Sequence, residues 1–246
     1  MNTIEMCAGA GGQALGLHNA GFQHTVLVEI DEYACKTLRQ NSAKLDLGWG
    51  EVFEGDLKAF ATEHAHKYRG KVTLVAGGVP CPPFSKAGKQ LGKDDERDLF
   101  PTALEVVRKV LPKAVLLENV AGLMDSQFAE YRDYIRAELA SMGYKSDWRL
   151  LQASDYGVPQ LRPRFILVAL QSEIFEHFTW PKAGEVSTPT VGEALYDLMV
   201  AEGWRGAEAW RDRASTIAPT LVGGSKKHGG PDLRPARGKR HGKSWE

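Results

Sequence analysis

The chain has 246 residues, of which 43% are hydrophobic and 25% charged, and its formal net charge at pH 7 is zero. This composition is that of a globular protein with one full core and room for a second small unit. The first residues lack the basic segment and apolar run of an export signal, and no later apolar run is long enough to cross a membrane. We therefore expect a soluble, cytoplasmic protein with no membrane partner.

The cysteines indicate the redox compartment, and the charge distribution indicates one possible partner. Cys7, Cys35 and Cys81 are odd in number and show no C-x-x-C spacing, so we expect a reducing compartment and no metal site. Residues 223–246 carry seven lysines and arginines against two carboxylates, whereas the rest of the chain has more acidic than basic groups. A basic end is compatible with contact to a phosphate backbone, and a solvated tail is the alternative.

Apolar, β-branched runs alternate with helix-period stretches over about the first 170 residues. This alternation is typical of βαβ units and predicts an α/β fold with a doubly wound, mostly parallel sheet. After about residue 175 the pattern weakens into a Pro-rich and then Gly/Lys/Arg-rich end, so we place a domain boundary there. The expected strands are 4–6, 25–28, 52–53, 72–78, 114–117 and 165–170, and the expected helices are 12–20, 31–40, 57–67, 99–110 and 128–142.

A glycine-rich segment, residues 8–12, follows the first expected strand and opens a helix. Its backbone can approach a ligand closely and present free N–H groups. Glu29 ends the second strand, where a carboxylate commonly binds a ribose diol. Asp56 ends the third unit and is placed to face an adenine amino group. Gly9 and Gly11 nearly fit the dinucleotide fingerprint, so an NAD-dependent oxidoreductase stays open as an alternative.

A second group of residues with reactive or charged side chains lies after the fourth and fifth expected strands and before the last one. Cys81 lies in Pro80-Cys81-Pro82-Pro83-Phe84-Ser85, a proline-rich turn at the sheet edge where ligands bind, so it can act as a nucleophile or be a buried small hydrophobe. Glu118 ends the fifth strand at the same edge, and it is either catalytic or paired to a nearby arginine. Arg162 and Arg164 alternate before the last strand and suit phosphate or carbonyl oxygens, or neutralise Glu118.

Together these segments resemble the DNA cytosine-C5 methyltransferases. The resemblance rests on four motifs in the family's order, with supporting matches at Arg97-Asp98-Leu99-Phe100 and residues 152–159, and it covers about residues 3–170. The four motifs are Cys7-Ala8-Gly9-Ala10-Gly11-Gly12, Pro80-Cys81-Pro82-Pro83-Phe84-Ser85, Glu118-Asn119-Val120 and Gln160-Leu161-Arg162-Pro163-Arg164. The resemblance implies an S-adenosylmethionine-dependent, Rossmann-like catalytic domain at 1–175. It also implies part of a target-recognition region with a basic tail at 176–246.

The resemblance also implies the roles of the site residues. Cys81 would add to C6 of a flipped cytosine, Glu118 would act at N3, Arg164 would hold O2 and orient Glu118, and Arg162 would support them. S-adenosylmethionine would bind the glycine loop (Cys7, Ala8, Gly9, Gly11 and Gly12), with Glu29 on its ribose and Asp56 and Pro80 on the adenine or amino-acid side. Cys7 and Ile30 replace aromatic residues of the family, so we expect weaker stacking on the cofactor.

The implied partners are double-stranded DNA and a second polypeptide. Ser85 and Lys89 belong to a polar segment expected to close over the flipped base, and Thr220 belongs to a Thr-Leu element of the target-recognition region. Two further motifs of the family, one of them Gln-x-Gly-Asn, do not occur in the sequence. We expect a second chain to supply them in a split enzyme of a restriction-modification system. The alternatives are a truncated form of a longer enzyme and an inactive DNA-binding module.

Overall fold

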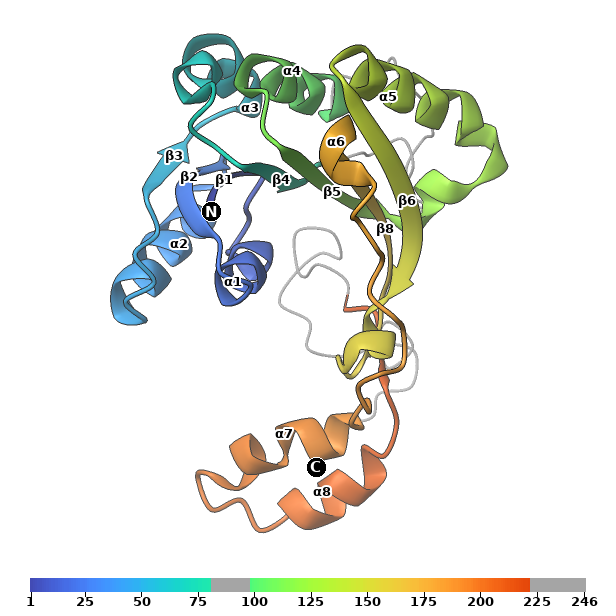
Figure 1. Cartoon of the computed structure of the whole chain (residues 1–246). Coiled ribbons are helices and arrows are strands. Elements are labelled where there is room, and N and C mark those ends of the chain that lie inside the picture. Colours follow the sequence, from blue (N-terminus) through green and yellow to red (C-terminus); the bar gives the residue numbers. More distant parts are fainter. Residues whose placement is uncertain (81–97, 222–246) are drawn as a thin grey trace. The chain divides into compact units, whose positions relative to one another are not determined.

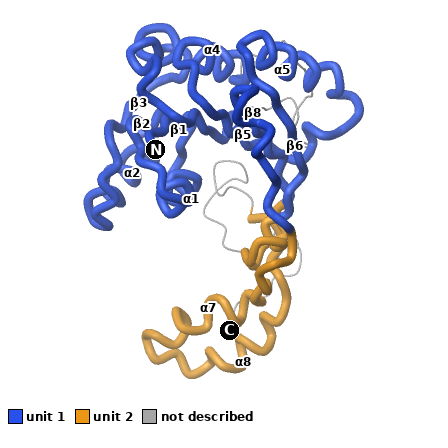
Figure 2. Tube along the Cα trace, viewed as in Figure 1, with its two compact units in different colours: residues 1–152, 163–182 blue, residues 153–162, 183–246 orange. Residues whose placement is uncertain are grey.

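The computed structural model describes residues 1–80 and 98–221. It divides into two compact units, one formed by residues 1–152 and 163–182 and the other by residues 153–162 and 183–246 (Figure 2). The assignment of a catalytic domain to 1–175 and a recognition region to 176–246 stays a prediction. The structure itself adds that residues 153–162 belong to the second unit.

The first unit contains a seven-stranded sheet in the order β3-β2-β1-β4-β5-β8-β6 (Figure 1). The first five of these strands are parallel, and β8 runs antiparallel to both of its neighbours, β5 and β6. The expected doubly wound, mostly parallel sheet is confirmed. The strands are β1 (Asn2–Met6), β2 (Gln23–Glu29), β3 (Glu51–Glu54), β4 (Leu74–Gly78), β5 (Ala114–Val120), β6 (Tyr144–Gln152) and β8 (Pro163–Gln171).

Helices cover both faces of this sheet, as its buried side chains require. On one face α1 (Gly12–Asn19) and α2 (Glu32–Lys44) pack through Ala14 and Leu38. On the other, α3 (Leu57–Ala59), α4 (Phe100–Val110) and α5 (Ala129–Ser141) enclose the larger core. A short helix, α6 (Ser172–Phe175), follows β8. Asp31 caps α2 as predicted, because its side chain accepts a hydrogen bond from Ala34 N at 2.9 Å.

One helix of this unit differs from the expectation, and one strand was not expected. The helix expected over 57–67 is a continuous helical segment of three kinds, α3 followed by a π-helix (Phe60–His64) and a 3₁₀-helix (Ala65–Tyr68). The strand β6 was not predicted. It lies at the edge of the sheet and its side chains are mostly only half-buried or exposed, so its sequence lacks the apolar run by which the other strands were recognised.

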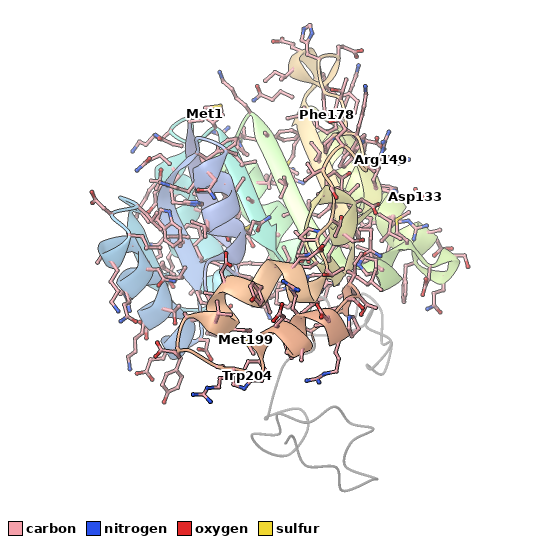
Figure 3. All side chains as sticks on the ribbon, turned by 90° about the horizontal axis from the view of Figure 1, so that it is seen from below. Met1, Asp133, Arg149, Phe178, Met199 and Trp204 are labelled. Carbon is pink, nitrogen blue, oxygen red and sulfur yellow. The ribbon has the colours of Figure 1, made fainter. Side chains whose placement is uncertain are left out.

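The second unit contains two helices that the sequence reading missed, α7 (Val191–Val200) and α8 (Ala207–Arg213). Figure 3 marks α7 at Met199 and the connection to α8 at Trp204. The helices approach closely at Gly192, where a Cβ atom would lie 2.3 Å from the carbonyl oxygen of Arg211. Thr190 and Glu193 form a capping box at the start of α7, a signal that could have predicted it.

The same unit holds a small parallel sheet of β7 (Gln160–Leu161) and β9 (Ala218–Pro219). In the part of the chain that the structure describes, no helix has the length and apolar character needed to span a membrane.

Candidate cofactor pocket and adjoining ion pair

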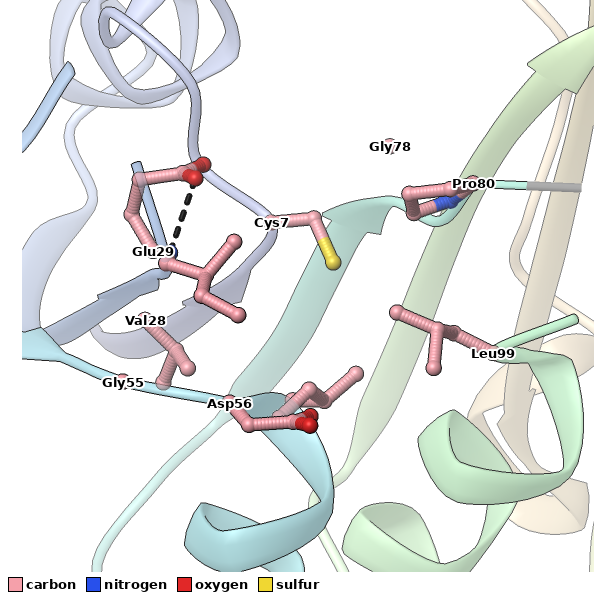
Figure 4. Close-up of a pocket in the computed structure, with 10 residues that line it drawn as sticks. Cys7, Val28, Glu29, Gly55, Asp56, Gly78, Pro80 and Leu99 are labelled. Carbon is pink, nitrogen blue, oxygen red and sulfur yellow. Dashed lines mark hydrogen bonds between the residues drawn. The ribbon is translucent and has the colours of Figure 1, made fainter. Parts of the chain in front are cut away.

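A pocket of about 200 Å³ lies at the carboxyl ends of β1 to β4 (Figure 4). This is the edge at which open α/β sheets bind ligands. The pocket brings together five of the residues predicted to bind the cofactor. Its lining consists of Cys7, Val28, Glu29, Ile30, Gly55, Asp56, Leu57, Gly78, Pro80 and Leu99. Sequence reasoning had not assigned Val28, Leu57 or Leu99 to this site.

The glycine loop reaches the pocket through Cys7 and then turns into α1. Cys7 and Gly11 both have positive φ, 53° and 92°, which is strained for the cysteine. A Cβ atom on Gly11 would lie 2.8 Å from the side chain of Leu38 and 3.1 Å from that of Trp49, so only glycine fits there. Gly11 caps α1 without a side-chain hydrogen bond, and the first turn of α1 contains no acidic residue. The helix N-terminus therefore keeps backbone donors for a ligand.

Glu29 fixes this loop from the end of β2. Its Oε2 accepts a hydrogen bond from Gly9 N at 2.7 Å, and its Oε1 accepts from Ile30 N and Asp31 N, both at 2.8 Å. The dashed line in Figure 4 marks the bond to Ile30. A carboxylate offers about four acceptor positions, so one stays available to a ligand hydroxyl. The carboxylate is thus held in one orientation at the pocket wall.

Asp56 supplies a second carboxylate to the pocket. It caps α3, since its Oδ1 accepts a hydrogen bond from Lys58 N at 2.8 Å. Beside it, Leu57 and Leu99 form apolar walls, and Ile30 is 68% exposed at the rim. Two carboxylates between apolar walls fit the nucleoside part of S-adenosylmethionine, which has ribose hydroxyl and adenine amino donors and a flat apolar ring, and they also suit the positive sulfonium next to it.

The Cys7 thiol resists ionisation in this pocket. Burial, followed by the negative charges of Glu29 and Asp56, raises the pKa of the Cys7 thiol to about 12. Burial also raises the pKa of Cys35. A thiol must ionise to act as a nucleophile, so neither of these two cysteines is suited to that role.

Glu118 and Arg164 form an ion pair beside the pocket, with 2.6 Å between Arg164 Nε and Glu118 Oε1. Glu118 is in β5 and Arg164 in the neighbouring antiparallel β8. The register of β4 and β5 places Glu118 beside Gly78, on which a Cβ atom would lie 3.4 Å from Glu118 Oε2. Because Gly78 also lines the pocket, the ion pair adjoins the predicted cofactor site.

Asn119 is a site residue that the sequence reading noted only as part of a motif. It is 3% exposed, and its Nδ2 donates a hydrogen bond to the carbonyl oxygen of Val79 at 2.9 Å. Its Oδ1 accepts from Val120 N at 2.8 Å. Asn119 thereby ties the end of β5 to the residue before Pro80, the last described position ahead of Cys81.

Ala8, Gly9, Gly11 and Gly12 form the glycine loop in the first unit but are not among the residues that line the pocket. The remaining predicted site residues belong to the second unit or to undescribed segments. Cys81, Ser85 and Lys89 lie outside the described residues. Arg162 and Thr220 belong to the second unit, where Arg162 accepts a backbone hydrogen bond from Ala153 N and Thr220 Oγ1 donates to the carbonyl of Leu161 at 2.6 Å. Among residues 1–80 and 98–221, no group of His, Cys, Asp and Glu is arranged to hold a metal ion.

Comparisons with known proteins show the family to which the chain is similar. The family model for C-5 cytosine-specific DNA methylases matches residues 1–233. The chain is 55% identical over 240 residues to the type II methyltransferase M.NaeI of Lentzea aerocolonigenes and 51% identical over 243 residues to M.NgoMIV of Neisseria gonorrhoeae. These matches cover 98% and 99% of the chain but 56% and 75% of the relatives, so the chain spans little more than half of M.NaeI.

Solved structures share the fold. A crystal structure described as a DNA modification methyltransferase encoded within an E. coli prophage has a TM-score of 0.64 and 26% sequence identity. The match covers 80% of the chain and 54% of that protein.

Proposed function

Because the chain belongs to the C-5 cytosine-specific DNA methylase family, we propose that it transfers a methyl group from S-adenosylmethionine to C5 of cytosine in duplex DNA. The names of its relatives favour a role in a restriction-modification system. Family membership removes the oxidoreductase alternative, which accounted for Gly9, Gly11 and Glu29 but left Cys81 and Glu118 without a role.

The ion pair of Glu118 and Arg164 is the observation that carries this proposal. C5 of cytosine becomes a carbon nucleophile only when a thiolate adds at C6 and electron density is drawn toward N3. Glu118, held by Arg164 at 2.6 Å beside the end of β4, suits a group that hydrogen-bonds or protonates N3. Arg164 keeps further N–H donors that suit the cytosine O2.

Cys81 is the proposed nucleophile, since it follows Pro80 directly and the thiols of Cys7 and Cys35 have raised pKa values. Its thiolate forms a bond to C6, and the resulting enamine carbon C5 takes the methyl group. When bound, S-adenosylmethionine supplies that methyl as a sulfonium substituent. As the bond from C5 to the methyl group forms, the sulfur–methyl bond breaks and the neutral thioether leaves. A water molecule acting as base then takes the C5 proton, the N3 proton returns to Glu118, and β-elimination of the Cys81 thiolate releases the methylated base.

Access to C5 and C6 requires the cytosine to leave the base stack, because both atoms are enclosed in duplex DNA. We assign Ser85 and Lys89 to contacts with the flipped base or its strand, Arg162 to support of the arrangement or the DNA backbone, and Thr220 to the target-recognition region. Bisulfite sequencing of DNA from cells that express the chain tests the whole proposal. Methylated cytosines at one sequence are expected, and a fully converted genome would favour an inactive DNA-binding module.

Glu29→Ala should weaken S-adenosylmethionine binding while leaving DNA binding unchanged. The substitution removes the proposed ribose acceptor and the three backbone hydrogen bonds that fix the loop, a loss on the order of 2–3 kcal/mol. Calorimetric titration with S-adenosylmethionine measures it. The matched control is Glu54→Ala, because Glu54 is the register partner of Glu29 on β3 but does not line the pocket. Equal affinity in the two variants would contradict the assignment.

A second polypeptide carrying Gln-x-Gly-Asn should raise the methyl-transfer rate of this chain strongly. In the family resemblance that motif completes the cofactor pocket and braces the recognition region. The measurement is methyl transfer and complex mass for the purified chain alone and after addition of candidate polypeptides. Full methylation by the 246-residue chain alone would show that no second chain is needed.

A further inference from the structure

A buried polar pair lies beneath the glycine loop, on the sheet face that α1 covers. Glu5 of β1 is 1% exposed and His24 of β2 is 2% exposed, and His24 Nδ1 lies 3.8 Å from Glu5 Oε2. Among the described residues, neither carboxyl oxygen of Glu5 nor Nδ1 of His24 makes a hydrogen bond of normal geometry, and the Ala14 N–H is a donor close to Glu5. Unpartnered polar groups are costly inside a protein, so this pair calls for an explanation.

A bulge in β2 turns His24 toward Glu5. Thr3 and Ile4 of β1 pair with His24 and Val26, which leaves Thr25 as an extra residue. Glu5 pairs with Leu27, and Leu27 packs with Ala14 in the cluster under α1. In a regular strand His24 and Leu27 would point to opposite faces, and the extra residue brings them to the same face.

Both side chains lie next to the backbone of Ala14, in the first turn of α1. His24 Nε2 donates a hydrogen bond to the Ala14 carbonyl oxygen at 2.8 Å, which assigns the ring proton to Nε2 and leaves Nδ1 as an acceptor. The N–H of Ala14 lies close enough to Glu5 to lower its pKa. Two buried side chains thus bracket the first turn of α1, directly after Gly9–Gly12.

Burial sets the protonation of both groups. It raises the pKa of Glu5 to about 8 and lowers the pKa of His24, so near pH 7 both are neutral. The carboxyl proton of Glu5 then faces the bare Nδ1 of His24, and an approach of about 1 Å would make a normal hydrogen bond. Of the other elements around Glu5, β4 offers Ala76 as its register partner, and α1 carries His18, whose charge lowers the pKa of His24.

We propose that Glu5, as a neutral acid facing His24, is a positioning residue that sets the first turn of α1 and thereby the glycine loop for the cofactor. This inference rests on the proposed function for its ligand. Loss of the Glu5 proton would leave a buried charge beside the first turn of α1, and the loop would lose its binding geometry. Cofactor affinity should therefore fall when Glu5 ionises.

The test compares wild type, Glu5→Gln and Thr3→Val between pH 6 and 9. Thr3→Val is the matched control, because Thr3 is a fully buried polar residue on the same strand whose Oγ1 donates a hydrogen bond to the carbonyl oxygen of Ile4 at 3.3 Å. S-adenosylmethionine affinity is measured by calorimetry. Wild type and Thr3→Val should lose about tenfold in affinity for each pH unit above the Glu5 pKa relative to Glu5→Gln. The cofactor's own amino group titrates equally in all three proteins.

The protonation of Glu5 can also be measured without any ligand. The folded pKa of Glu5 lies above its unfolded value of 4.5, so the folded state retains a proton that the unfolded chain releases, and stability falls as pH rises from about 4.5 to about 8. The melting temperature of wild type should fall over this range more than that of Glu5→Gln. The carbon-13 shift of the Glu5 carboxyl in wild type gives the pKa directly, even if the variant does not fold.

The outcomes separate the two proposals. A wild type that binds no S-adenosylmethionine overturns the proposed function, while the melting curves and the carboxyl titration still test the buried pair. Normal binding with identical pH profiles in wild type and Glu5→Gln overturns the positioning role. A Glu5 carboxyl that titrates near pH 4 overturns it as well.

Discussion

Cys81→Ala should abolish methyl transfer and leave S-adenosylmethionine binding intact. The proposed thiolate is the group that adds to C6 of cytosine, and without it C5 is too weak a nucleophile to take the methyl group. The thiol is proposed to act on the base and not on the cofactor, and the described pocket already contains the proposed cofactor contacts of Glu29 and Asp56, so cofactor affinity should change little. DNA containing 5-fluorocytosine should form a covalent adduct with the wild type, detected by mass spectrometry, because fluorine at C5 blocks the final elimination.

The matched control for this experiment is Cys35→Ala. Cys35 is a buried free cysteine in α2 with a raised pKa, so its loss should leave both the adduct and the activity in place. Methylation by the Cys81→Ala protein would end the assignment of Cys81 as the nucleophile.

Glu118→Gln should slow the chemical step by about 10²- to 10⁴-fold, the usual size of a general acid's contribution. Glutamine keeps the shape of the side chain. It can neither form the ion pair with Arg164 nor transfer a proton to N3. Single-turnover methylation measures the effect. Cofactor affinity, measured by calorimetry, should stay at the wild-type value, because the pocket lining does not include Glu118.

Glu138→Gln provides the comparison, since it breaks an ion pair of similar length, 2.7 Å, between Glu138 and Arg108 on exposed helix surfaces. Surface pairs of this kind contribute little, so this variant should methylate normally. A Glu118→Gln protein with the wild-type single-turnover rate would exclude a role for Glu118 at N3.

The core strands and most helices of the first unit could be predicted from the sequence because each carries its own periodic signal. Residues 74–78 and 114–117 are continuous apolar runs, as expected for the inner strands of a sheet covered on both faces. The edge strand β6 and the helices α7 and α8 were missed. The edge strand has few buried side chains, and α7 has one buried residue, Gly192, so neither shows a strong apolar pattern.

The sequence by itself determined the family and the residues that are candidates for cofactor binding and catalysis. It could do so because the glycine loop, the Pro-Cys turn and the Glu-Asn segment are each contiguous motifs at strand ends. Only the tertiary structure decided which of these groups touch. The antiparallel register of β5 and β8 brings Arg164 to Glu118, and the bulge at Thr25 brings His24 to Glu5. Such contacts depend on register and strand order, which non-local pairing fixes and which no local pattern encodes.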